Sequence, residues 1–321
     1  MTVGAGPAAE GVRVPWADVP VQVRVAVEAV CGAPVVRADT QRGGFSPGVA
    51  ARVVCADGRR FFIKAIAAVA NSQSFRIHRR EGVVLAGLGP LVQAGRLAVP
   101  GLHGVVDEHG WVALVLQDVD GRQPTLPWRR DELAAVLRAV DRLGEVLTPA
   151  PIDAPPASEA YDEPFSGWRT LADDGRRADL LDAWSRAHLD RLAGLEATWP
   201  SFAAGTSLLH TDLRADNLLL TADGVVVVDW PWACVGSPLL DVVGLSPSVA
   251  MQGGPEPDQL LAMTEAGRAA DRDAVAALAC AVAGYFTEVA LQPPPPGLPT
   301  VREFQAAQGA VARRWLESLL S

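Results

Sequence analysis

Two oxygen-bearing side chains, Asn217 and Asp229, flank a short hairpin in the C-terminal half of the chain. The segment LLLTADGVVVV between them is typical of two strands joined by a turn at residues 222–224. A register that pairs Thr221 with Val225 also pairs Asn217 with Asp229, and directly opposed residues have Cβ atoms about 5 Å apart. An amide oxygen and a carboxylate at that spacing could share one Mg²⁺, which takes few protein ligands. The sequence therefore predicts a magnesium site here.

A third functional candidate, Asp212, precedes Asn217 by a short loop in the segment HTDLRADN. A carboxylate so close to a bound metal could orient an attacking hydroxyl group. The order His-x-Asp, then Asn, then Asp after a hairpin resembles the catalytic loop and metal-binding segment of protein-kinase-like phosphotransferases. Taken singly, Asp and Asn at strand ends are more often turn residues or caps, so the prediction rests on their combination and spacing.

Lys64 is the only lysine among the 28 lysine and arginine residues of the chain. It lies in the predicted strand RFFIKAI, and the next predicted helix places Glu81 on one face with apolar Ile77, Val84 and Leu88. A carboxylate among core positions needs a cation, and a lone Lys amid many Arg indicates a need for a compact ammonium. We expect Lys64 and Glu81 to pair and to position α- and β-phosphates. The alternative is that both are surface charges.

The glycine-bearing stretch RGGFSPGVA precedes this strand. Gly43, Gly44 and Gly48 allow a tight turn, and backbone N–H groups near Ser46 could face phosphate oxygens. An ordinary hairpin loop is the alternative reading of the same residues. The chain has no G-x-x-x-x-G-K-[ST] pattern, which disfavours a P-loop nucleotide-binding site.

The elements that must position these residues follow from periodicity and turn signals. A short helix near 19–30 precedes strands RVVC and RFFIKAI, which flank an Asp-Gly hairpin signal; a helix over 72–89 and the strand WVALVLQDV come next. From 131 onward the pattern is mostly helical, with a Pro-rich spacer before the last helix. At 321 residues, two lobes are expected. We predict an α+β fold with an N-terminal nucleotide-binding lobe, 1–118, built on a small antiparallel sheet, and a helical C-terminal lobe, 119–321.

Six segments together resemble the aminoglycoside phosphotransferase family of the protein-kinase-like fold. They are GGFSPGVAARV, FIKA, HRREGVVLAGL, LVLQDVDG, HTDLRADNLLL and VVVVDWPWACVGSPLLDVV. The resemblance spans roughly residues 40 to 250. It implies a bilobal small-molecule kinase that moves the γ-phosphoryl of ATP or GTP onto a hydroxyl, with Mg²⁺ as cofactor.

The same resemblance implies a role for each matching residue. Asp212 would be the catalytic base or hydroxyl orienter, Asn217 and Asp229 the Mg²⁺ ligands, and Lys64, held by Glu81, the phosphate contact. The implied supporting residues are His210 and Asp241, which would brace the catalytic loop, and the backbone of Gln117 to Val119, which would hydrogen-bond the adenine.

The acceptor pocket is the least constrained part of the prediction. Arg214, Asp216 and Trp230 stand where many relatives have a His-Pro-Gly-like sequence or Phe-Gly, and they border the expected pocket. Aromatic and acidic contacts could also come from the segment after the Pro-rich break, namely Tyr161, Asp162, Glu163, Trp168, Asp173 and Asp174. Such a surface could receive an aminoglycoside or another cationic amino sugar, whereas the alternative is that these are caps and core aromatics. A metabolic kinase for choline, homoserine or an amino sugar and a nucleotide-binding pseudokinase are the competing functions.

Composition narrows the partners and the compartment. The net charge of −9 disfavours nucleic acid. Cys31, Cys55, Cys234 and Cys280 have no ligand or disulfide spacing and are expected to be buried thiols in the cytoplasm. The N-terminus has no secretory signal pattern, and the apolar run from Ala274 to Phe286 is shorter than the roughly 20 residues that cross a bilayer. No membrane partner is therefore expected, and the oligomeric state is left open.

Overall fold

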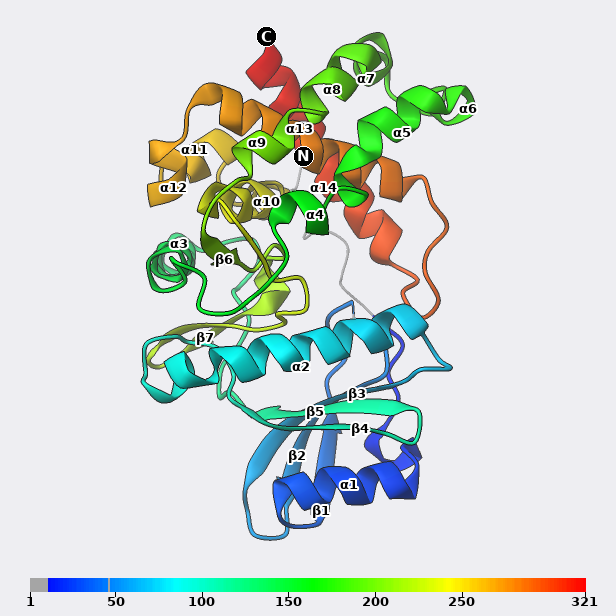
Figure 1. Ribbon diagram of the computed structural model, residues 1–321, viewed down its shortest axis with the longest axis vertical. Coiled ribbons are helices and arrows are strands. Elements are labelled where there is room, and N and C mark those ends of the chain that lie inside the picture. Colours follow the sequence, from blue (N-terminus) through cyan, green and yellow to red (C-terminus); the bar gives the residue numbers. More distant parts are fainter. Residues whose placement is uncertain (1–10, 46) are drawn as a thin grey trace.

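The computed structural model describes residues 11–45 and 47–321, with a small sheet at one end and most helices at the other (Figure 1). The sheet is antiparallel with the order β1-β2-β3-β5-β4. Its strands are β1 Val35–Thr40, β2 Val49–Cys55, β3 Arg60–Ala67, β4 Leu102–Glu108 and β5 Trp111–Gln117. The predicted Asp-Gly hairpin is confirmed: β2 pairs with β3 up to Val54 and Arg60, and Gly58 in the turn has a φ of 83°.

Each face of the sheet is covered by one helix. Helix α1, Val21–Cys31, packs its residues Val23 and Val27 in one cluster with Ile63 of β3. Helix α2, Ser72–Gln93, crosses the other face and lies between the sheet and the helical part (Figure 1). Because side chains alternate along a strand, Lys64 next to Ile63 faces α2. The sheet thereby directs the only lysine toward the rest of the protein.

The C-terminal part is helical, as the sequence pattern predicts. Its α-helices are α3 Arg130–Val146, α4 Ala157–Ala160, α5 Gly167–Asp173, α6 Gly175–Ala178, α7 Ala183–Ala187, α8 Leu189–Glu196, α9 Trp199–Phe202, α10 Pro238–Met251, α11 Pro257–Leu261, α12 Glu265–Ala269, α13 Arg272–Ala290 and α14 Val301–Leu320. The described residues also form the short 3-10 helices η2 Pro164–Ser166 and η3 Ala215–Asn217 in this part and η1 Trp16–Asp18 before α1. The mixed class with a small antiparallel sheet and a helical C-terminal part is therefore confirmed.

Helix α13 is the centre of the helical part and packs against α5, α8, α10 and α14. By length and composition it could cross a membrane, which the shorter apolar run in the sequence did not indicate, but 67% of its apolar window is buried inside the protein. Burial of this kind is expected of the core helix of a globular domain. The predicted boundary at 118 and 119 lies just after β5, and Leu114 of β5 shares a cluster with Val136 of α3.

Two small two-stranded sheets carry the polar segment of the C-terminal part. Strand β6, Ser207–Leu209, pairs with β9, Cys234–Gly236, and β7, Leu218–Thr221, pairs with β8, Gly224–Val227. The predicted register of the second hairpin is wrong by one residue, because Thr221 pairs with Gly224 rather than Val225. The turn has two residues, a length that suits the strand twist. Asn217 consequently lies opposite Val228, whose N–H donates to the Asn217 carbonyl oxygen at 3.0 Å.

Candidate active site

Lys64 bridges the two lobes through two carboxylates. Its Nζ donates to both carboxylate oxygens of Glu81, at 2.9 and 2.7 Å, and to Oδ1 of Asp229 at 2.7 Å. Lys64 is 9% exposed and Glu81 is 1% exposed, so the pair is not a surface contact. The Lys64–Glu81 ion pair predicted from the sequence is present. The additional contact with Asp229 was not predicted.

Burial and opposite charge compete in setting the protonation of this cluster. Burial lowers the pKa of Lys64, but Asp229 and Glu81 outweigh it, so the pKa lies above its ordinary value. Burial raises the pKa of Asp229, but Lys64 outweighs that effect and the pKa falls to about 2. Burial raises the pKa of Glu81. At neutral pH Lys64 is therefore cationic and Asp229 is a carboxylate.

The loop after β6 is held by His210 and Asp241, as the resemblance implied. The Asp241 carboxylate, in the first turn of α10, accepts the backbone N–H groups of His210 at 2.9 Å and Thr211 at 2.5 Å. The His210 ring accepts the N–H of Asp212 on Nδ1, at 3.1 Å, so its Nε2 carries the proton that is donated to the Val228 carbonyl oxygen at 3.0 Å. These bonds join the loop to α10 and to the segment after β8, and they support the left-handed backbone of Thr211, φ 64°.

Asp212 lies on this loop and faces the larger of two cavities. Its main-chain oxygen and its Oδ2 accept from Nδ2 of Asn217, at 2.8 and 3.2 Å, and the Arg214 guanidinium lies 3.4 Å from its Oδ1. Burial raises the pKa of Asp212 to about 7, with Arg214 opposing the shift. A carboxylate with a pKa near neutrality can accept a proton from a hydroxyl group more readily than an ordinary Asp.

Asn217 and Asp229 line the same cleft despite the corrected register. Asp229 has a left-handed backbone, φ 69°, which ends the strand geometry and lets its carboxylate reach Lys64. Nδ2 of Asn217 donates to Asp212. Oδ1 of Asn217 and Oδ2 of Asp229 accept no hydrogen bond from the described residues. Both oxygens are of the type that Mg²⁺ prefers. No group of three or more His, Cys, Asp and Glu side chains suited to a metal occurs in 11–45 or 47–321, so phosphate oxygens and water would have to complete the shell.

The smaller cavity, about 410 Å³, has the residues predicted for a nucleotide along its walls. Gly44, Lys64, Gln117 and Val119 line it together with the Asn217 and Asp229 pair. The Gln117 N–H donates to the Gly101 carbonyl oxygen, so it is engaged within the protein, whereas the Val119 N–H has no partner among the described residues. Among the predicted backbone contacts at the lobe junction, the Val119 N–H is therefore available to a base.

The glycine-rich turn differs from the prediction in one respect. Ser46 lies outside the described residues. Gly48 does not line the cleft: its N–H donates to the Val12 carbonyl oxygen, and it accepts from the Val14 N–H. Only glycine suits this position, because the backbone has a φ of 97° and a Cβ would lie 2.5 Å from the Ala65 oxygen. Gly48 therefore allows the tight turn, as predicted, but its N–H is engaged within the protein, so its place among the predicted nucleotide-binding residues is not supported.

Arg13 was missed, because no motif surrounds it in the sequence. Its guanidinium donates to the carbonyl oxygens of Gly43 and of Gly44, the latter at 3.3 Å, and it lines the nucleotide-sized cleft. It lies about thirty residues before the glycines that it contacts, in a segment that bonds to the backbone of Gly48.

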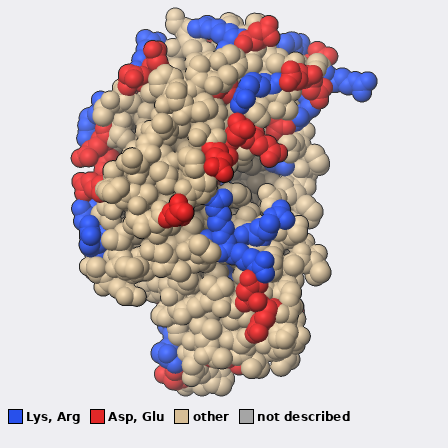
Figure 2. All heavy atoms as spheres, viewed as in Figure 1, with Lys and Arg blue, Asp and Glu red and all other residues tan. Residues whose placement is uncertain are grey.

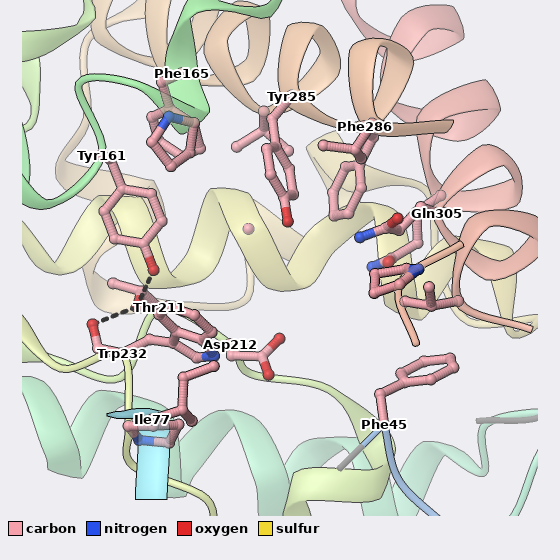
Figure 3. A pocket seen from close by; sticks show the side chains of 18 of the residues that line it. Phe45, Ile77, Tyr161, Phe165, Thr211, Asp212, Trp232, Tyr285, Phe286 and Gln305 are labelled. Carbon is pink, nitrogen blue, oxygen red and sulfur yellow. Dashed lines mark hydrogen bonds between the residues drawn. The ribbon is translucent and has the colours of Figure 1, made fainter. Parts of the chain in front are cut away.

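The larger cavity, about 670 Å³, lies on the other side of Asp212 and Asp229 and is shown in Figure 3. Of the predicted acceptor residues, Tyr161, Glu163 and Arg214 line it, and the Tyr161 hydroxyl donates to Oγ1 of Thr211 at 2.6 Å. Asp216 instead lines the smaller cleft and pairs with Arg214 at 3.2 Å. On the face seen in Figure 2, acidic side chains border a hollow on the side of the helical part, and basic side chains border it on the side of the sheet.

Several predicted acceptor residues belong to the interior or to helix caps. Trp230 is wrong as a pocket residue: it is fully buried, its Nε1 donates to the Val227 carbonyl oxygen, and its ring contacts His210 at 4.7 Å between centroids. The backbone reversal at Asp229 turns the next side chain into the core. Trp168 is also fully buried. Three of the predicted acidic residues do not line the cavity: Asp162 and Asp173 are exposed, and Asp174 caps α6.

The walls that sequence reasoning missed come from α13, α14 and the glycine-rich turn. Tyr285, Phe286, Gln305 and Phe45 point toward the space around Asp212 (Figure 3). The signal that could have found the first two is a pair of aromatic residues at the end of an otherwise small-residue helix, RDAVAALACAVAGYFTEVA. Nothing local relates that helix to Asp212, which is far from it in sequence.

Comparisons with known proteins indicate the family and the fold of the chain. A sequence model described as the phosphotransferase enzyme family matches residues 43–278. A search among curated proteins gave no match. Similar solved structures include a putative fructosamine-3-kinase from Haemophilus somnus 129PT, with 14% identity, coverage of 93% of this chain and 97% of that chain, and a TM-score of 0.58.

Two further structures resemble the chain to the same degree. The choline kinase LicA from Streptococcus pneumoniae has 12% identity, covers 92% of this chain and 98% of its own, and gives a TM-score of 0.59. A thermostable mutant of the aminoglycoside phosphotransferase APH(4)-Ia, in a ternary complex with ADP and hygromycin B, has 15% identity, coverage of 91% and 98%, and a TM-score of 0.58. The shared fold confirms the kinase-like architecture predicted from the sequence.

Proposed function

Because the chain belongs to the phosphotransferase enzyme family, we propose that it transfers the γ-phosphoryl group of ATP or GTP to a hydroxyl group of a small molecule. One observation carries the proposal: Asp229 lines both cavities, with Lys64 bonded to it on one side and the Asp212 loop beside it on the other. A donor in the smaller cleft and an acceptor in the larger one would meet at these carboxylates. The known complex of a similar fold with ADP and hygromycin B supports two ligands of this kind.

The residues would divide the work as follows. Lys64, steered by Glu81, would contact donor phosphate oxygens, and Asn217 with Asp229 would hold Mg²⁺, which supplies neutralisation of phosphate charge when bound. Asp212 would accept a hydrogen bond from the acceptor hydroxyl and take its proton at a carboxylate oxygen. Arg214, 3.4 Å from Asp212, keeps a positive charge beside that group. Positioning contributes most, since transfer passes through a loose transition state.

The competing functions make different demands on the same residues. A pseudokinase would have no use for a raised Asp212 pKa beside an intact Lys64–Glu81 pair, so we favour an enzyme. An aminoglycoside, another cationic amino sugar and a metabolic alcohol such as choline or homoserine are the candidate acceptors of the proposed reaction. The four cysteines, all buried and unpaired, support a location in the cytoplasm, where thiols stay reduced.

The experiment combines purified enzyme, Mg²⁺, ATP or GTP and a panel of alcohols, with phosphorylated product measured by mass spectrometry. Asp212→Asn should lower kcat by about 10²- to 10⁴-fold, the usual contribution of a general base, and leave nucleotide affinity unchanged. Asp229→Asn should abolish calorimetric binding of Mg²⁺-nucleotide. Asp174→Asn, which alters only a helix cap on α6, is the matched control. Normal turnover by the Asp212 variant would refute its role.

A further inference from the structure

The volume of the larger cavity indicates a minimum size for the acceptor. At about 670 Å³ it falls within the range of roughly 300 to 1,000 Å³ that is typical of sites for drug-sized ligands. A molecule as small as choline would leave most of this volume to water. The cavity therefore suits an acceptor that extends well beyond its reacting hydroxyl group.

Most acidic side chains of the cavity are already bonded within the protein. The acids that line it are Glu81, Glu163, Asp212, Asp229, Asp241 and Glu288. Lys64 bonds Glu81 and Asp229, and Asp241 accepts two backbone N–H groups of the catalytic loop. Glu288 pairs with Arg177 at 2.6 Å and accepts from Gln292. These four acids are thus committed to internal contacts.

The remaining charges offer little to a polycation. Asp212 belongs to the reaction centre, and Glu163 is the one lining acid whose side chain has no bond to any residue in 11–45 or 47–321. Arg80 and Arg302, which have no carboxylate partner among the described residues, line the same space and repel ammonium groups, whereas Arg214 is paired with Asp212 and Asp216. A cation that is moved out of water needs a partner charge. The cavity can supply one such partner outside the reaction centre, whereas an aminoglycoside brings several ammonium groups.

Aromatic side chains form much of the wall instead. Figure 3 shows Tyr161, Phe165, Tyr285 and Phe286 side by side along one boundary, with Phe45 across the space and Asp212 between them. Further along, Phe304 contacts Phe45 at 5.1 Å between ring centroids. Aromatic surfaces bind flat or apolar groups and can hold a single cation through its contact with ring faces. They do not replace several carboxylates.

Two neutral polar groups in this wall lack partners. Gln308 of α14 lines the cavity, is 2% exposed, and its amide makes no hydrogen bond to the described residues. The Tyr285 hydroxyl, which points into the cavity in Figure 3, likewise has no hydrogen bond to them. Buried polar groups are generally hydrogen-bonded. An acceptor with uncharged polar groups near α13 and α14 would satisfy both.

We propose that the acceptor is a hydroxylated molecule of drug size that is neutral or carries one positive charge, and that has a broad aromatic or alicyclic face. Its hydroxyl group meets Asp212, its apolar face lies on the Tyr285 and Phe286 wall, and an uncharged polar group reaches Gln308. This inference rests on the proposed function, because it concerns the acceptor of the same reaction. It replaces the polycationic aminoglycoside as the expected substrate.

Binding without turnover tests the inference separately from catalysis. Neutral glycosides with aromatic or alicyclic aglycones, beginning with 4-nitrophenyl β-D-glucopyranoside, and a matched set of aminoglycosides, beginning with kanamycin A, are titrated calorimetrically into enzyme saturated with Mg²⁺ and ADP. We expect at least one neutral glycoside to bind about tenfold or more tightly than every aminoglycoside, a difference worth about 1.4 kcal/mol. Tighter binding by an aminoglycoside or by choline, or no binding by any neutral glycoside, would overturn the inference.

Variants locate the bound ligand and separate the two proposals. For the best glycoside, Phe286→Ala should weaken binding by about tenfold through lost apolar contact, whereas Glu163→Gln should change it by less than about threefold, as for an exposed charge. The reverse order contradicts the inference. Unchanged nucleotide affinity and unfolding midpoint show that each variant is folded. If the neutral glycosides bind as expected and no phosphorylated product forms with any acceptor, the phosphotransferase proposal fails while the cavity assignment stands.

Discussion

Replacing Lys64 by Met should destabilise the protein strongly, because two carboxylates depend on this one ammonium. Lys64 is 9% exposed and contacts Glu81 and Asp229 at 2.7 Å each. Met has a similar length and no charge, so the variant removes the cation with little change in packing. Glu81, 1% exposed, would then lie beside Asp229 with no neutralising partner.

The size of the effect follows from burial. Removing one partner of a buried ion pair costs about 3 to 5 kcal/mol, because the other charge stays desolvated. Proteins of this kind have a total stability of about 5 to 15 kcal/mol, so the loss is a large part of it. The pKa of Lys64 is raised above its ordinary 10.5 by the two carboxylates, against the effect of burial. Its contribution is therefore fully present below pH 10.5 and is lost only as the pH rises through the folded-state pKa.

The assay is urea unfolding at pH 7.5 followed by tryptophan fluorescence. Lys64→Met should lower the free energy of unfolding by the amount above, and the double variant Lys64→Met/Glu81→Gln should recover most of the loss, because a neutral amide needs no cation. Arg59→Met is the control: its ion pair with Asp57 is exposed in the β2–β3 turn, and no measurable change is expected. If Lys64→Met unfolds at the same urea concentration as the wild type, the cluster is not a buried, mutually dependent unit.

Two further predictions concern stability. Burial, together with the charge of Lys64, lowers the pKa of His78 from 6.5 to about 4. The contribution of neutral His78 to stability should therefore be fully present above pH 6.5, and stability should fall by about 3 kcal/mol as the pH drops toward 4. The unfolding midpoint of His78→Gln should change less between pH 7.5 and pH 5 than that of the wild type, and identical pH profiles of the two proteins would exclude His78 as the cause. Gly167→Ala should lower the free energy of unfolding by about 1 to 3 kcal/mol, because the new Cβ would lie 2.2 Å from the Gly284 oxygen. Gly194→Ala, where the Cβ would meet open space, should not destabilise the protein. Equal melting temperatures of the two variants would contradict close packing of α5 on α13.

The Lys64–Glu81 pair could be predicted because its signals are local and of two independent kinds. Strand alternation assigns Lys64 to one face of β3, and helical periodicity assigns Glu81 to the apolar face of α2. Elements adjacent in sequence usually pack together, so a charged residue on each facing surface indicates an ion pair. Asp229, also bonded to Lys64, comes from a distant segment, and no period in the sequence relates the two.

The β7–β8 hairpin shows that the residues of a site can be predicted correctly although the predicted strand register is wrong. A one-residue change in pairing moves side chains to the opposite face of a strand, so the observed pairing of Thr221 with Gly224 removes the predicted opposition of Asn217 and Asp229. Their joint presence in the cleft depends instead on the left-handed backbone of Asp229 and on the 3-10 turn that ends at Asn217. Asp tolerates this conformation better than most residues, but the sequence pattern does not specify it.

The acceptor cavity was the hardest part to predict because its wall is assembled from segments with no common periodicity. Phe45 comes from the glycine-rich turn, Tyr161 from the end of α4, and Tyr285 from α13. An acidic stretch such as Tyr161 to Glu163 looks suited to a cation in the sequence, but charge density along a chain does not show which carboxylates are already bonded. Only three-dimensional pairing distinguishes Glu288, neutralised by Arg177, from Glu163. The charge that a substrate meets is therefore set by tertiary contacts, and for that reason the same catalytic residues are compatible with acceptors of very different charge.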